Sequence, residues 1–169
     1  MERPGGRLSQ FHNVWKELGA PPKIRQILKD GYKIQLLGEP VLTPPKSKWA
    51  THLHMEEMRI ARDKVAQLSQ KGVIEEVSWS TAEADPGLFS RLFCIRKRMG
   101  SGHRAIIDLS RFNDCVEKKS FKMTTIGDIR CTISRECFST SVDLEDAFYH
   151  IPLHKSSRKY TRFILDGTI

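Results

Sequence analysis

Residues 92–109 read LFCIRKRMGSGHRAIIDL, and this stretch decides most of what the sequence predicts about the fold. Two stretches rich in apolar residues, Leu92–Arg98 and His103–Leu109, flank the turn sequence MGSG. Glycine adopts backbone conformations that other residues resist, so it favours the short loops that join paired strands. The stretch therefore predicts a β-hairpin.

Positive charge is concentrated at the expected tip of this hairpin. If Gly100 and Ser101 form the loop, Lys97 faces Arg104 directly across the two strands. Like charges in that position destabilise a hairpin by roughly a few tenths of a kcal/mol or more. The arrangement predicts either an anion that offsets the repulsion or a basic tip surrounded by water. The hairpin by itself favours the solvated tip.

A further strand is predicted over Phe138–Asp143, where apolar and polar residues alternate. Successive side chains of a strand point to opposite faces, so Asp143 is expected at the strand end on its polar face. A carboxylate held there can bind a divalent cation, since Mg²⁺ prefers oxygen ligands. It can equally cap the helical turn that follows, and the segment alone does not separate these interpretations.

The remaining elements follow from periodicity and from the positions of glycine and proline. Helices are expected at residues 8–18, 24–28 and 56–71, and the last has the clearest apolar face. Extended segments are expected at residues 32–37, 73–77 and 159–165, with a polar loop at 78–87. Asp166-Gly167 is a strong signal for a two-residue hairpin turn, so the chain looks interrupted just inside a return strand.

The composition is typical of a soluble globular protein. The 169 residues fit one domain, and 39% of them are hydrophobic, which allows a core of moderate size. A net charge of +8 favours phosphate-rich partners, although many basic proteins bind none. The sequence contains no signal peptide, no membrane span and no Cys-x-x-Cys motif among its four cysteines. We expect reduced thiols, no membrane partner, and a location in the cytoplasm or nucleus.

Several segments, taken in order, resemble the reverse transcriptases of retrotransposons, and especially those of the tyrosine-recombinase (DIRS-type) group. Residues 92–113 are similar to the hairpin of the fingers subdomain, and the FKM sequence at residues 121–123 is similar to the connection after it. Residues 141–153, SVDLEDAFYHIPL, resemble the first palm motif, and residues 158–163 resemble the strand that follows. The similarity is weaker over residues 5–87.

This resemblance implies an α/β fold, more narrowly α+β. Residues 1–50 would form a helical N-terminal extension with a proline-rich linker, poorly anchored to the remainder. Residues 51–169 would form the fingers and the first part of a split ferredoxin-like palm, truncated before the palm is complete. His103 and Phe148 depart from the family, which commonly has tryptophan and tyrosine at these positions.

The resemblance also implies a metal site for nucleotidyl transfer. Asp143 would be the catalytic carboxylate and would bind both Mg²⁺ ions of a two-metal site, and the carbonyl of Leu144 would add a metal ligand. The family's second carboxylate pair has no counterpart, because the sequence contains no Asp-Asp. We therefore expect the chain alone to be inactive as a polymerase and to bind Mg²⁺ weakly or not at all.

Five further residues would contact the incoming nucleotide in such an enzyme. Lys97 and Arg104 would hold its phosphates, which would account for the repulsive pair. The backbone amides of Asp146 and Ala147 would touch the triphosphate. Phe148 would lie beneath the sugar and exclude a 2′-hydroxyl, or else would be an ordinary core phenylalanine.

The partners implied by the resemblance are a deoxynucleotide and an RNA or DNA template-primer. A different class of function stays open beside it: a non-enzymatic nucleic-acid-binding or interaction module, retained by a host, that kept the basic hairpin.

Overall fold

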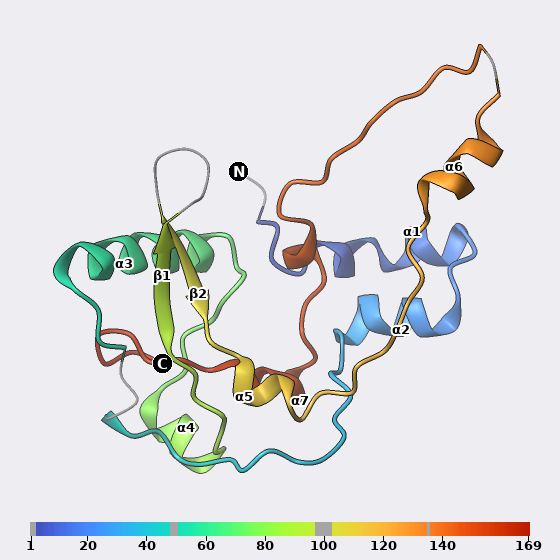
Figure 1. The fold of residues 1–169 in the computed structure, drawn as a ribbon. Helices are drawn as coiled ribbons and strands as arrows, with labels where there is room; N and C mark the ends of the chain where they lie inside the picture. Colours follow the sequence, from blue (N-terminus) through green and yellow to red (C-terminus); the bar gives the residue numbers. More distant parts are fainter. Residues whose placement is uncertain (1–2, 48–50, 97–102, 135) are drawn as a thin grey trace.

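The computed structural model describes residues 3–47, 51–96, 103–134 and 136–169 and shows a mixed fold of short helices around a small sheet (Figure 1). The α-helices are α1 (His12–Glu17), α2 (Pro22–Asp30), α3 (Met55–Gln70), α4 (Trp79–Ala84), α5 (Ser110–Asn113), α6 (Ile126–Thr132) and α7 (Lys155–Arg158). The 3-10 turns are η1 (Arg7–Phe11), η3 (Ala147–His150) and η4 (Lys159–Thr161), and the strands are β1 (Leu92–Arg96) and β2 (His103–Ile107). The α+β class is confirmed. Within the described ranges, no helix is both long and apolar enough to cross a membrane.

The long helix α3 confirms the helix expected at residues 56–71. Glu56 and Glu57 stand in its first turn, where carboxylates stabilise the positive end of the helix dipole. Its chain turns away at Gly72, whose φ of 68° lies in the left-handed region that glycine adopts without strain. Ala61 is fully buried where α3 crosses the two strands, which places this helix across one face of the hairpin (Figure 1).

Among the described residues, two small groups of buried side chains form the core, and one extended segment joins them. Ala61, Leu92 and Leu165 form the first group, between α3, the hairpin and the C-terminal segment. Ile164 belongs to the second group, which lies under α4. Because successive side chains of an extended chain point to opposite sides, the neighbours Ile164 and Leu165 are buried in different groups.

The β-hairpin is confirmed, but the predicted register is wrong. Arg104 pairs with Ile95 rather than with Lys97, and the last described pair is Arg96 with His103. Lys97 lies outside the described residues. Side chains alternate with a period of two, so this two-residue shift leaves Arg104 on the expected face of the hairpin. The strand pairing therefore does not support a repulsive Lys97–Arg104 pair, which was the reason to expect a bound anion.

The N-terminal residues are anchored to the rest of the chain, contrary to expectation. Gly6 donates its amide hydrogen to the carbonyl of Tyr149 at 2.8 Å. Tyr32 donates to Pro152 at 2.8 Å and accepts from the amide of His154 at 3.0 Å, forming an isolated parallel bridge with the C-terminal segment. The extended segment at residues 32–37 and the helix expected at 24–28, found as α2, are confirmed.

Four other expectations are wrong. Residues 73–77 form no strand, and the loop expected at 78–87 contains α4, because the Ser78 hydroxyl accepts from the amide of Thr81 at 3.2 Å and caps that helix. Residues 138–143 form no strand either, since no described segment pairs with them. The strand expected at 159–165 begins as η4 and is extended only after it.

The turn predicted at Asp166-Gly167 is confirmed. Both residues have positive φ angles, 51° for Asp166 and 79° for Gly167, as a tight hairpin turn requires. Leu165 and Thr168 exchange two backbone hydrogen bonds across it, each 2.9 Å long.

An arm formed by residues 117–145 is the most exposed part of the described chain. Every described residue of this arm is exposed, including those of α6. The arm leaves the body after α5, carries α6 outward and returns to η3, as Figure 1 shows in yellow to orange. Its apolar side chains therefore add little to the core.

Limited trypsin digestion is expected to cut this arm first. Proteases act on segments that lack protection by packing or hydrogen bonding, and the arm offers Lys118, Lys119, Lys122 and Arg130. Mass spectrometry of early fragments should place the first cleavages between residues 118 and 130. First cleavage within α3, at Arg59 or Lys64, would show instead that the arm is protected.

Candidate nucleic-acid interface

The segment with most of the predicted site residues joins the arm to η3. Asp143 and Leu144 are exposed, and Asp143 makes no hydrogen bond or ion pair with another described residue. The interpretation of Asp143 as a helix cap is wrong, because Asp146 occupies the N-cap position of the following turn η3. The carboxylate of Asp143 is thus open to solvent on a segment of irregular backbone.

Asp146 fixes the entry into η3. Its φ of 55° places it in the left-handed region, which aspartate tolerates better than most residues. Its carboxylate forms an ion pair with Lys71, just beyond the last turn of α3, and that hydrogen bond raises the pKa of Lys71. Tyr149 donates its amide hydrogen to the Asp146 carbonyl at 2.9 Å. Of the predicted nucleotide-binding residues, Asp146 is therefore held against the end of α3.

Phe148 is not a core residue, because 93% of its surface is exposed. Its neighbour Ala147 is exposed as well. Phe148 lines the edge of a cleft of about 1210 Å³ that also reaches Val65 of α3 and Phe163 of the C-terminal segment. The alternative of an ordinary buried phenylalanine is wrong, and the contact of Phe148 with a sugar stays a prediction.

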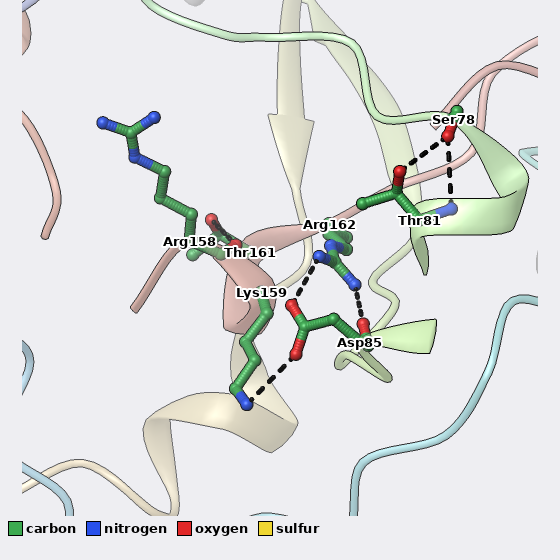
Figure 2. A network of polar contacts seen from close by, with 7 residues as sticks. All are labelled: Ser78, Thr81, Asp85, Arg158, Lys159, Thr161 and Arg162. Carbon is green, nitrogen blue, oxygen red and sulfur yellow. Dashed lines mark hydrogen bonds and ion pairs between the residues drawn. The ribbon is translucent and has the colours of Figure 1, made fainter. Parts of the chain in front are cut away.

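The basic side chains of this cleft are largely neutralised. Asp85 accepts from Lys159 at 3.4 Å and from Arg162 at 3.1 Å, and its carbonyl also accepts from Arg162 at 2.5 Å (Figure 2). Arg158 pairs with Glu75 at 2.6 Å. These pairs join α7 and η4 to the segments around α4. Because these three cations have carboxylate partners, the cleft attracts phosphate less than its basic residues alone would indicate.

The hairpin presents a basic surface away from this cleft. Leu92, Cys94 and their partners pack against α3, so the alternate residues Phe93, Ile95 and Arg104 lie on the opposite face. Arg104 is exposed, and burial raises the pKa of the Cys94 thiol on the covered face. By the same alternation Arg96 belongs to the face of Cys94, but it is exposed at the strand end, and neither arginine forms an ion pair with a described residue.

The predicted site residues are only partly brought together. Asp143 to Phe148 are consecutive and lie around η3, which packs against η1. Arg104 lies on β2, which packs against β1 and α3, and neither Arg104 nor Asp143 lines the cleft beside Phe148. Lys97 is outside the described residues, so its position relative to Asp143 stays a prediction.

The described residues do not by themselves assemble a site for Mg²⁺. Over the described ranges, no group of three or more His, Cys, Asp or Glu side chains is close enough to hold a metal ion. Asp143 offers one free carboxylate, and that of Asp146 is engaged by Lys71. The binding of Mg²⁺ at Asp143 and Leu144 therefore stays a prediction, and no reaction step follows from it here.

The turn at Asp166 is held to α3 by a two-point ion pair. Arg62 donates from Nε at 2.5 Å and from Nη2 at 3.0 Å to the two carboxylate oxygens. These hydrogen bonds lower the pKa of Asp166 below its ordinary value and raise that of Arg62. Sequence analysis missed this pair because its members stand 104 positions apart in the chain.

Acid is expected to weaken the fold in part through this pair. A carboxylate whose pKa is lower in the folded state stabilises the fold above its unfolded pKa, near ~3.9, and loses that effect as the pH falls through its folded pKa. Chemical denaturation should show that the free energy of unfolding declines from pH 6 down to pH 2. Asp166→Asn should make this decline shallower. Arg62→Gln should flatten it equally, and the double variant should add nothing. Additive effects of the two substitutions would show that the residues do not act as a pair.

A comparison with models of known protein families gives no match to the chain.

Proposed function

We propose that this chain is the fingers and early palm portion of a retroelement RNA-directed DNA polymerase, and that its own activity is nucleic-acid binding without catalysis. The observation that carries the proposal is the ordered series of similar segments at residues 92–113, 121–123, 141–153 and 158–163. One such segment is weak evidence, whereas four in the same order are much more specific.

Three features of the molecule support the binding of nucleic acid. The net charge of +8 attracts phosphates, and Arg96 and Arg104 add exposed, unpaired guanidinium groups at the hairpin. Arginine binds phosphate oxygens through two parallel hydrogen bonds, so these groups suit a polynucleotide backbone. Asp143 and Phe148 are both open to solvent, as contact with a nucleotide requires.

Charge reversal at the hairpin is expected to weaken polynucleotide binding. With Arg96→Glu and Arg104→Glu together, the dissociation constant for a primed template should rise about tenfold or more at low salt. The slope of log affinity against log salt should fall by about 2, since two phosphate contacts are lost. Fluorescence anisotropy of a labelled primed oligonucleotide measures both quantities.

A matched control distinguishes the effect of the hairpin arginines from the effect of net charge. Lys16→Glu and Lys23→Glu make the same change in charge at exposed positions of α1 and α2. The control should weaken binding much less than the hairpin variant. Equal effects would indicate attraction by overall charge alone and would remove the hairpin from the proposed interface.

Catalysis is not proposed for these 169 residues, because a two-metal site needs more carboxylates than Asp143 supplies. Purified protein incubated with a primed template, deoxynucleotides and Mg²⁺ should give no extension. Extension that disappears with Asp143→Asn would overturn this part of the proposal and make the chain an active polymerase.

The second candidate is a non-enzymatic nucleic-acid-binding or interaction module, supported by the exposed Arg96 and Arg104, which need no metal to bind phosphate. The two candidates agree on binding and differ at Asp143. In a polymerase portion, Asp143→Asn should abolish any Mg²⁺-dependent binding of a deoxynucleotide, measured by calorimetry with the primed template present. In a module, no such Mg²⁺-dependent binding should be found.

A further inference from the structure

The exposed arm carries a serine between lysines. Residues 118–122 read KKSFK, and all five are exposed. Residues 117–125 belong to no helix or strand, and the Ser120 hydroxyl makes no hydrogen bond with another described residue. At the base of the arm, Glu117 donates its amide hydrogen to the carbonyl of Gln35 at 2.9 Å, so the body of the protein presents this short tract outward.

A second serine between basic residues has opposite surroundings. Residues 155–158 read KSSR and form α7. Ser157 is 1% exposed, and its hydroxyl oxygen accepts from the amide of Ile34 at 3.1 Å. Ser156 lies within hydrogen-bonding distance, 2.8 Å, of His154 Nδ1. The sequence also holds Ser47 between Lys46 and Lys48, beside residues that the structure does not describe. Among Ser120, Ser156 and Ser157, only Ser120 is both extended and unbonded.

We propose that Ser120 is a phosphorylation site for a serine/threonine kinase that selects basic residues on both sides of the acceptor. Such an enzyme binds its substrate as an extended segment of several residues, which the exposed arm supplies and α7 does not. Acidic groups in the kinase cleft would pair with Lys118, Lys119 and Lys122. The proposal goes beyond the proposed function and does not depend on it.

The reaction is an ordinary phosphoryl transfer from ATP. The Ser120 Oγ forms a bond to the γ-phosphorus while the bond from that phosphorus to the bridging oxygen breaks, and ADP leaves. The hydroxyl proton passes to a base of the kinase. The product is a phosphoserine and no electrons are exchanged.

Phosphorylation would remove the positive charge of the tract. Residues 117–122 hold three lysines and one glutamate, a net charge of +2, and Glu117 already pairs with Lys119 at 3.2 Å. A phosphoserine adds about −1.5 to −2 at pH 7, which brings the tract close to zero. If the chain binds nucleic acid as proposed above, this change should raise its dissociation constant severalfold. That consequence alone rests on the proposed function.

The test uses the full chain with ATP and the catalytic domain of protein kinase C, followed by mass spectrometry of the sites. Phosphate is expected at Ser120 at least tenfold faster than at Ser156 or Ser157. Ser120→Thr should keep the modification and Ser120→Ala should abolish it. Lys118→Glu with Lys119→Glu should slow it at least tenfold. A kinase that selects acidic flanks should modify Ser120 poorly.

Comparable rates at Ser120 and Ser157, or modification of other residues while Ser120 stays unmodified, would overturn the proposal. The effect on binding is then read by anisotropy with the phosphorylated chain. Unchanged affinity would remove the regulatory consequence and leave the site intact. A lack of oligonucleotide binding by the unmodified chain would instead count against the proposed function.

Discussion

Replacing Ile164 with alanine is expected to lower the free energy of unfolding by about 3 kcal/mol, within the range of ~2–5 kcal/mol for large-to-small substitutions in cores. Ile164 is fully buried and is the largest side chain of the described residues to be so. It packs with Ala82 and Ile169 in the group under α4. Removing the outer carbons of Ile164 loses their burial and leaves a cavity. The backbone cannot readily close this cavity, because the Ile164 carbonyl accepts a hydrogen bond from the Thr51 amide at 2.9 Å.

Urea denaturation followed by circular dichroism measures this loss. Ile126→Ala is the matched control, because Ile126 is 74% exposed in α6 and should change the free energy of unfolding by no more than about 0.5 kcal/mol. A loss below about 1 kcal/mol for Ile164→Ala would mean that this segment does not form the core described here.

Replacing Gly31 with alanine is expected to cost at least about 2 kcal/mol of stability, since strained backbone conformations each cost ~1–3 kcal/mol and a steric clash adds to that. Gly31 has a φ of 91°, which side chains rarely permit. A Cβ there would lie 2.6 Å from the amide nitrogen of His154 and 2.7 Å from the carbonyl carbon of Leu153. The backbone bridge between Tyr32 and Leu153 would have to move.

Two other glycines separate the strain from the clash. Gly19 shares the positive φ, at 75°, but a Cβ would meet nothing within 4 Å, so Gly19→Ala should show strain alone, about 1–2 kcal/mol. Gly38 has neither feature, so Gly38→Ala should be neutral or slightly stabilising. Equal stability of Gly31→Ala and Gly38→Ala would contradict the close approach of the N-terminal segment to residues 153–154.

Elements specified by nearby residues were predictable from the sequence. The helix α3 follows from its apolar face, its acidic first turn and Gly72. The turn at Asp166-Gly167 follows from local turn chemistry. The hairpin was also predicted, but its register depends on how far the pairing extends towards the tip, which alternation does not specify.

Elements that depend on distant residues were not predictable. The alternation at residues 138–143 would make a strand only beside a partner, and no described segment pairs with it. Asp146 and Lys71 meet across 75 positions, and Asp85 and Arg162 across 77, so neither pair is visible in a local pattern. For the candidate site, sequence similarity indicated the residues, whereas their exposure required the structure.

The burial of Ile164 and Leu165 on opposite sides has a consequence for how the protein opens. If the segment with Ile164 and Leu165 detaches from one core group, it also detaches from the other and exposes both. The α3–hairpin group and the group under α4 should therefore belong to one cooperative unfolding unit. In native-state hydrogen exchange, the slowest amides of β1 and of α4 should therefore share a single opening free energy. The amides of α6 should exchange through far smaller fluctuations, because the arm shares no burial with either group.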